Sequence, residues 1–113
     1  MEIAVQRLAD GVAKVMLQGR FDGAAAAAVE LPLNKVAGEH SLVVIDLSAV
    51  SFLSSAGVRT LLIVAKAVGQ KGGRTALVCP DNSAARVLKI AKIDDVIPTF
   101  QDESAALTAV TSA

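Results

Sequence analysis

The feature that most constrains this chain is a run of six residues, 42–47, in which only Asp46 is polar. A strand with one face in water alternates apolar and polar residues, whereas a strand covered on both faces is apolar almost throughout. The run therefore predicts a central strand of a sheet. Strand-like and helix-like segments alternate after it, which favours parallel strands joined by right-handed helical crossovers.

The start of the chain departs from this alternation, because two strand-like runs, 2–8 and 12–19, are separated only by residues 9–11. Asp10 and Gly11 supply the residue types of a tight turn. Strands joined so closely pair antiparallel. We therefore expect an α/β fold with a mixed open sheet, formed by an antiparallel N-terminal hairpin plus parallel strands, and about four helices.

The first predicted helix covers residues 24–37 and begins with five alanines after Asp22, a favoured N-cap residue. Pro32 lies inside it, which predicts a kink or two short helical pieces. The remaining predicted elements, in chain order, are a helix at 55–69 ended by glycines, a strand at 75–79, a helix capped by Asp81 or Asn82, an edge strand at 96–98 and a helix from 102 through 110.

Charge and composition exclude several classes of function. Eleven Lys and Arg residues balance eleven Asp and Glu residues, so no positive field attracts nucleic acid or anionic lipid. A single cysteine excludes an internal disulfide framework. The chain shows neither a secretory signal pattern nor an apolar stretch of the roughly 20 residues that a spanning helix needs. We expect one cytoplasmic domain, residues 1–113, with no nucleic-acid partner and no direct membrane contact.

Residues that usually perform catalysis are scarce. The one histidine, His40, lies in a polar turn, so neither a metal cluster nor a Ser-His-Asp arrangement can form around it. Cys79 lies in an apolar strand, where a thiol has little thiolate character. The glycines at 69–73 follow a helix and precede a strand, the reverse of a phosphate-binding loop. We expect a binding protein without a metal or cofactor rather than an enzyme.

The informative segment is 45–58, where we expect the central strand to end and a turn-rich loop to follow. Two adjacent hydroxyl groups, those of Ser54 and Ser55, stand where the next helix begins. Ligands and partners tend to bind at the carboxyl ends of strands in open α/β sheets. Serine is also a favoured helix N-cap, and the spacing alone favours that simpler role for Ser54 or Ser55.

The same segment resembles the phosphorylation loop of the anti-sigma factor antagonist family, whose members consist of a STAS domain. That loop reads Asp-Leu-Ser, then an aromatic or apolar pair, then a serine-bearing turn and a glycine that opens a helix. The matching residues here are Asp46-Leu47-Ser48, Phe52-Leu53 and Ser54-Ser55-Ala56-Gly57, with further matches at Gly19-Arg20-Phe21-Asp22 and Ile97-Pro98-Thr99-Phe100. The resemblance covers essentially the whole chain.

The resemblance implies a STAS fold and a function in bacterial partner switching. An anti-sigma factor that is also a serine-protein kinase binds the unphosphorylated antagonist and phosphorylates one of its serines, and a phosphatase reverses the mark. Alignment on the glycine places the acceptor at Ser55, with Ser54 as the less favoured position, where many relatives have an aspartate. The implied partner-binding residues are Asp22, Ser54, Ser55, Ala56, Gly57 and Val58.

Two other hypotheses remain open. The first is a STAS module that serves as a non-switching adaptor in a stress-signalling or transporter complex. The second is a receiver domain phosphorylated on aspartate, which the position of Asp46 on the central strand suggests. Receivers need further acids near the end of the first strand to hold Mg²⁺, and the residues there, Gln6 and Arg7, are not acidic.

Overall fold

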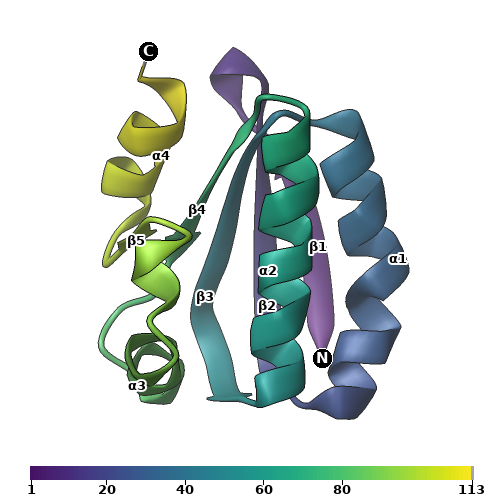
Figure 1. Ribbon diagram of the computed structural model, residues 1–113, viewed down its shortest axis with the longest axis vertical. Coiled ribbons are helices and arrows are strands. Elements are labelled where there is room, and N and C mark those ends of the chain that lie inside the picture. The colour runs from purple at the N-terminus through teal and green to yellow at the C-terminus, as the bar shows by residue number, and fades with distance from the viewer. Residues whose placement is uncertain (113) are drawn as a thin grey trace.

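The computed structural model describes residues 1–112 as a twisted sheet with helices on both faces (Figure 1). Its elements, in chain order, are β1 (Glu2–Arg7), a 3-10 turn (Ala9–Gly11), β2 (Val12–Phe21), α1 (Gly23–Glu39), β3 (Leu42–Leu53), α2 (Ser55–Gln70), β4 (Arg74–Val78), α3 (Ser83–Ile90), a second 3-10 turn (Ile93–Asp95), β5 (Thr99–Phe100) and α4 (Glu103–Thr111).

The strands lie in the order β1-β2-β3-β4-β5, so each is hydrogen-bonded to its neighbours in the sequence. β1 pairs antiparallel with β2, and every later pair is parallel. The predicted α/β fold, with its N-terminal hairpin, parallel strands and four helices, is confirmed. No helix in residues 1–112 is long and apolar enough to cross a membrane.

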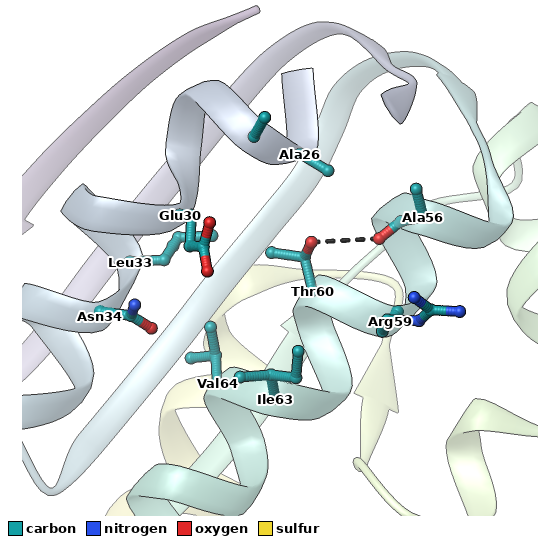
Figure 2. Close-up of a pocket in the computed structure, with 10 residues that line it drawn as sticks. Ala26, Glu30, Leu33, Asn34, Ala56, Arg59, Thr60, Ile63 and Val64 are labelled. Carbon is teal, nitrogen blue, oxygen red and sulfur yellow. Dashed lines mark hydrogen bonds between the residues drawn. The ribbon is translucent and has the colours of Figure 1, made fainter. Parts of the chain in front are cut away.

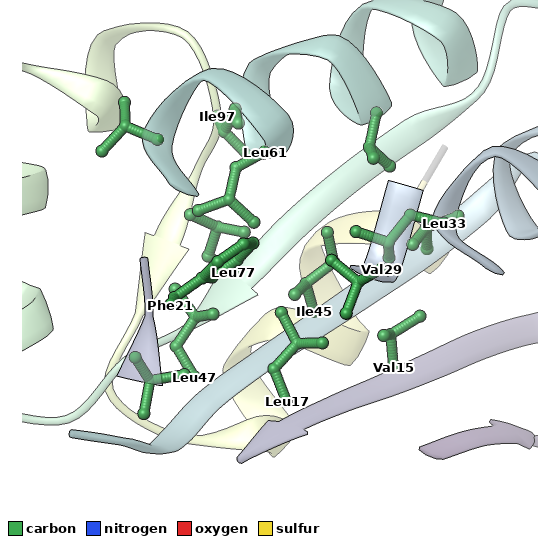
Figure 3. Close-up of a cluster of buried hydrophobic side chains, with 14 of the residues drawn as sticks. Val15, Leu17, Phe21, Val29, Leu33, Ile45, Leu47, Leu61, Leu77 and Ile97 are labelled. Carbon is green, nitrogen blue, oxygen red and sulfur yellow. The ribbon is translucent and has the colours of Figure 1, made fainter. Parts of the chain in front are cut away.

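Two hydrophobic clusters lie on opposite faces of the sheet, and β3 contributes to both. Ile45 and Leu47 belong to the larger cluster, beneath α1 and α2, whereas Val44 belongs to the smaller one, beneath α4. Figure 3 shows the larger cluster, where side chains from the strands meet Leu33 of α1 and Leu61 of α2. Apart from Asp46, β3 is therefore apolar over residues 42–47, because helices cover both of its faces.

Helix α1 runs unbroken through Pro32 from Gly23 to Glu39, so the two short helical pieces that the sequence allowed do not form. A proline at this position leaves the carbonyl of Ala28 without its helical donor. Ala28 is exposed, so water can bond that carbonyl. Val29 and Leu33, on either side of Pro32, are both buried against the sheet. This burial holds the two halves of α1 in one helix.

Strand β3 is also longer than predicted, and the turn-rich loop expected after Leu47 does not form. The strand continues to Leu53 and the helix α2 begins two residues later. Shifts in the register between β2 and β3, at Met16/Gln18 and Gly19/Arg20, accommodate the extra residues as bulges. The serines therefore lie directly at the end of a strand.

The last strand was predicted at 96–98 and is instead β5, Thr99–Phe100, at the edge of the sheet. The backbone N–H of Ile97 donates to the carbonyl of Ile93, in the preceding 3-10 turn, so it cannot join the sheet. Pro98 has no N–H, but its carbonyl accepts a hydrogen bond from Leu77 on β4. The strand that pairs with β4 therefore starts at Thr99, three residues later than predicted.

Candidate functional site

Three helices begin at one edge of the sheet, where the parallel strands β2, β3 and β4 end. Each begins with a side chain that accepts a hydrogen bond from the backbone N–H three residues later. The three caps are Asp22 to Ala25 at 3.0 Å, Ser54 to Gly57 at 3.1 Å and Asn82 to Ala85 at 3.0 Å. The last residues of β2 and β3, Phe21 and Leu53, are register partners. Asp22 and Ser54 therefore follow paired residues at this edge.

Ser54 ties the start of α2 to the end of β2. Its hydroxyl donates to the carbonyl oxygen of Phe21 at 2.7 Å and accepts from the backbone N–H of Gly57 at 3.1 Å. Its own backbone N–H donates to the same Phe21 carbonyl at 2.9 Å. The hydroxyl proton of Ser54 is thus already engaged. Ser54 has the capping role that the spacing favoured.

Ser55 differs from Ser54 in both exposure and hydrogen bonding. It is the first residue of α2 and its side chain is exposed. Within residues 1–112, the hydroxyl of Ser55 takes part in no side-chain hydrogen bond. The oxygen of Ser55 can therefore be reached from solvent without breaking a side-chain hydrogen bond of residues 1–112.

The residues after Ser55 turn quickly toward the interior. Gly57 is buried, and a Cβ atom there would lie 2.7 Å from Cδ1 of Leu53 and 3.0 Å from the ring of Phe21. Val58 is only 9% exposed, and Ala56 is half-buried. The structure brings all six implied partner-binding residues to one edge, but only Ser55 among them is exposed. Their roles in binding stay predictions.

Sequence reasoning missed the importance of Phe21. Its carbonyl accepts two hydrogen bonds from Ser54, and its ring lies beneath Gly57. Near it, the guanidinium group of Arg20 lies 4.4 Å from the centre of the Phe52 ring, a cation–π contact. The chain has only three phenylalanines and no other aromatic residue. Two of the three, Phe21 and Phe52, lie next to the predicted site, and this clustering is the sequence signal that could have pointed to Phe21.

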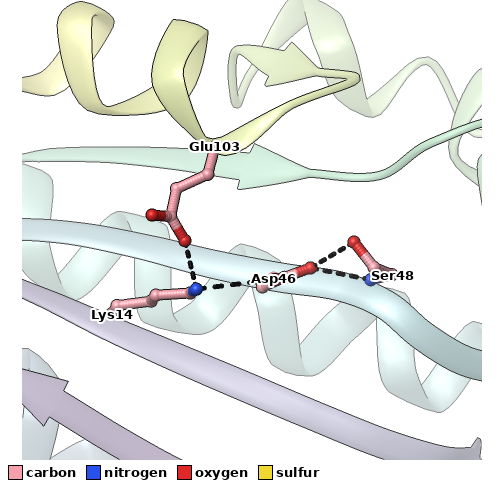
Figure 4. A network of polar contacts seen from close by, with 4 residues as sticks. All are labelled: Lys14, Asp46, Ser48 and Glu103. Atoms are coloured by element: carbon pink, nitrogen blue, oxygen red, sulfur yellow. Dashed lines mark hydrogen bonds and ion pairs between the residues drawn. The ribbon is translucent and has the colours of Figure 1, made fainter.

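Asp46 does not resemble the acceptor of a receiver domain. One of its oxygens accepts from the backbone N–H of Ser48 at 2.8 Å and from the Ser48 hydroxyl at 2.5 Å. The other lies 4.0 Å from Lys14 Nζ, which also pairs with Glu103 at the start of α4 (Figure 4). No group of three acidic, His or Cys residues in the described chain could hold a metal ion. The strand order also differs from the 2-1-3-4-5 order of that fold.

The surroundings of Cys79 and His40 are those of residues with structural roles. Cys79 is 4% exposed, and its Sγ lies 3.3 Å from Oδ1 of Asn82, the cap of α3. Burial, and secondarily the negative charge of Asp46, raise the pKa of the Cys79 thiol to about 11. The thiol therefore has little thiolate form near neutral pH. His40 follows the end of α1, and its carbonyl accepts from Lys71.

Residues 4–106 match the STAS domain family. The chain is similar to the anti-sigma-F factor antagonist RsfB of Mycobacterium tuberculosis, with 31% identity over 102 residues, which is 89% of this chain and 83% of that protein.

Solved structures show the same fold. An anti-sigma factor antagonist from Mycobacterium paratuberculosis superimposes with a TM-score of 0.88 and 31% identity, over 96% of this chain and 92% of that one. The Bacillus cell fate determinant SpoIIAA in its phosphorylated form superimposes with a TM-score of 0.72 and 17% identity, over 96% and 99% of the two chains. At that identity the second likeness shows the fold alone.

Proposed function

This chain belongs to the STAS domain family, and from that premise we propose that it is an anti-sigma factor antagonist that works by partner switching through phosphorylation of Ser55. We further propose that residues 1–113 form one STAS domain. In its unphosphorylated form the domain binds an anti-sigma factor that is also a serine-protein kinase. Phosphorylation of Ser55 releases that partner, and a phosphatase restores the binding form.

The observation that carries the proposal is the difference between the two serines. A phosphoryl group replaces the proton of the hydroxyl that accepts it, so a kinase acting on Ser54 would have to break its bond to the Phe21 carbonyl. The same reaction at Ser55 breaks no hydrogen bond in the described chain, and Ser55 is the more exposed of the two. Ser55 is therefore the better acceptor on physical grounds.

The position of Ser55 also supports a switch that acts on an interface rather than on the fold. Phosphorylation adds a charge of about −1.5 to −2 at neutral pH, and the N-terminus of a helix stabilises negative charge. The domain should therefore tolerate the phosphoryl group. A partner that covers Ser55 would have to desolvate the dianion, and each 1.4 kcal/mol of that cost lowers the affinity about tenfold.

The experiment uses the purified chain, ATP and the anti-sigma factor kinases of the same organism. We expect mass spectrometry to find one phosphoryl group on Ser55, absent from Ser55→Ala and still present in Ser54→Ala. We expect Ser55→Asp to lose at least tenfold in affinity for the kinase by calorimetry. The proposal would be contradicted if phosphate were found on another residue and Ser55→Ala were still released from the kinase as the wild type is. Unchanged binding of Ser55→Asp would instead favour a non-switching adaptor.

A further inference from the structure

A row of exposed residues leads along α2 away from the proposed acceptor. Ser55, Arg59 and Ile63 follow one another at intervals of four residues, so they lie on the same side of the helix in successive turns. All three are exposed, and Ile63 is 53% exposed despite its apolar side chain. At about 1.5 Å per residue, Ile63 lies about 12 Å along the helix axis from Ser55.

This row borders a groove between α1 and α2, with a volume of about 220 Å³ (Figure 2). The groove is lined by Ala26, Ala27, Glu30, Leu33 and Asn34 of α1 and by Ala56, Arg59, Thr60, Ile63 and Val64 of α2. Leu33 and Val64 are buried and provide an apolar base. The hydroxyl of Thr60 is bonded to the carbonyl of Ala56, at 3.0 Å, so it needs no partner from outside the helix.

The two sides of the groove have opposite charges. Glu30 lies on the α1 side and Arg59 on the α2 side, and Figure 2 shows their charged groups well apart. Both residues are exposed, and neither is in a salt bridge within residues 1–112. A ligand that fits this groove would therefore place an apolar side chain between a basic group, facing Glu30, and an acidic group, facing Arg59.

A protein interface of typical size that is centred on Ser55 would also cover the groove. A stable interface covers about 800 Å² on each partner, which is a disc of about 16 Å radius. A partner centred on Ser55 would therefore reach Arg59 and Ile63. Ala56, which follows Ser55, is itself part of the groove.

We propose that the groove between α1 and α2 is the docking site of the anti-sigma factor. The occupant is a segment of that protein with an apolar side chain flanked by one basic and one acidic residue. This inference rests on the proposed function and names the surface through which it operates. Arg59 also links the groove to the switch, because a phosphoryl group on Ser55 lies one helical turn away and attracts its guanidinium group.

The test measures the affinity of the full chain for the purified anti-sigma factors of the same organism by calorimetry. Ile63→Asp places a charge at the groove, and Ile90→Asp is the matched control, because Ile90 on α3 is 76% exposed and does not line the groove. Arg59→Glu is compared in the same way with Arg86→Glu on α3. Both changed isoleucines are exposed, and circular dichroism checks that each variant is folded.

We expect Ile63→Asp and Arg59→Glu to weaken binding at least tenfold, while both controls bind like the wild type. Wild-type affinity of Ile63→Asp, or an equal loss in Ile90→Asp, would overturn the docking site. If Ser55→Asp still lost affinity in that case, the proposed switch would stand alone. If Ile63→Asp lost affinity while Ser55→Asp bound like the wild type, the docking site would be supported and the proposed switch would be contradicted. A wild type that binds none of the anti-sigma factors would overturn both.

Discussion

Ser54 and Ser55 have identical side chains and adjacent positions, yet their hydroxyl groups have different surroundings. The hydroxyl of Ser54 is held between the carbonyl of Phe21 and the N–H of Gly57. The side chain of Ser55 points from the first turn of α2 into solvent. At the scale of single residues, Ser54 caps α2, whereas the hydroxyl of Ser55 makes no side-chain hydrogen bond within residues 1–112.

This difference predicts opposite effects of two alanine substitutions. Ser54→Ala removes the cap of α2 and should lower the free energy of unfolding by about 1–2 kcal/mol. Ser55→Ala should change it by less than about 0.5 kcal/mol, since no side-chain hydrogen bond within residues 1–112 is lost. Urea denaturation followed by circular dichroism measures both. Equal destabilisation by the two substitutions would show that Ser55 is also part of the structure.

Two glycines of α2 give a second matched pair. Gly57→Ala would place a Cβ atom 2.7 Å from Leu53, so α2 must shift, and we expect a loss of about 1–3 kcal/mol. Gly69→Ala faces open space near the end of the same helix and should stabilise the protein by about 0.5–1 kcal/mol. Thermal and urea unfolding of the two variants and of the wild type measure these changes in stability. A neutral Gly57→Ala would contradict the close packing of α2 on β2.

The buried thiol of Cys79 predicts slow chemical labelling. With a pKa raised from 9.0 to about 11, its thiolate fraction at pH 8 is about 100-fold lower than that of an ordinary cysteine. A thiol reagent should therefore react at least that much more slowly with the native protein than with the protein in urea. Equal rates in the two states would contradict the burial of Cys79.

The same raised pKa gives a dependence of stability on pH. Between pH 9 and about 11 the unfolded thiol has lost its proton while the native thiol retains it. The unfolded state then binds fewer protons, so the free energy of unfolding falls as the pH rises through this range. The contribution of the Cys79 thiol to the free energy of unfolding should be complete below pH 9. It should be absent in Cys79→Ala, which serves as the control for other groups that titrate between pH 9 and about 11.

At the scale of elements, α1 keeps a helical course in spite of Pro32 because residues on both sides of the proline are buried. The proline therefore lowers the stability of α1 without ending it. Pro32→Ala restores a helical donor and should raise the free energy of unfolding by about 1–3 kcal/mol. Urea denaturation measures the gain. A loss of stability would show that the proline makes a contact that matters more than the missing hydrogen bond.

Helix α4 is attached to the opposite face of the sheet by packing and charge. Ala106 and Val110 lie in the smaller hydrophobic cluster with Val44 of β3. Glu103, in the first turn, pairs with Lys14 of β2, and Lys14 is only 15% exposed. This charged cluster occupies the face of β3 away from the groove between α1 and α2. It explains Asp46, the one polar residue of the run 42–47, as a neighbour of Lys14.

At the scale of the whole molecule, the proposed switch should leave the fold unchanged. Ser55→Asp adds a negative charge at the N-terminus of α2, where we expect a stabilisation of about 0.3–1 kcal/mol. Thermal unfolding at low salt measures the change, and it should shrink as salt is added. Unfolding of Ser55→Asp, or a large loss of stability, would show that phosphorylation acts through the fold rather than through an interface.

Much of this architecture follows from local patterns in the sequence. The apolar run at 42–47 is enough to predict a central strand, because only a strand covered on both faces needs it. The short connection at residues 9–11 determines the antiparallel hairpin, and the capping residues mark the starts of the helices. The features that were predicted wrongly all depend on neighbours in space. They are a division of α1 into two pieces, the length of β3 and the position of β5.

The roles of the two serines required the tertiary structure. The sequence places both hydroxyl groups at the start of a helix, and either could have been the cap. The choice depends on the carbonyl of Phe21, which is 33 residues away in the chain and reaches Ser54 because β2 and β3 pair in parallel register. The sequence by itself thus determined that two serines stand at the start of α2. The pairing of two distant strands decided that the Ser54 hydroxyl is engaged, while that of Ser55 makes no side-chain hydrogen bond within residues 1–112.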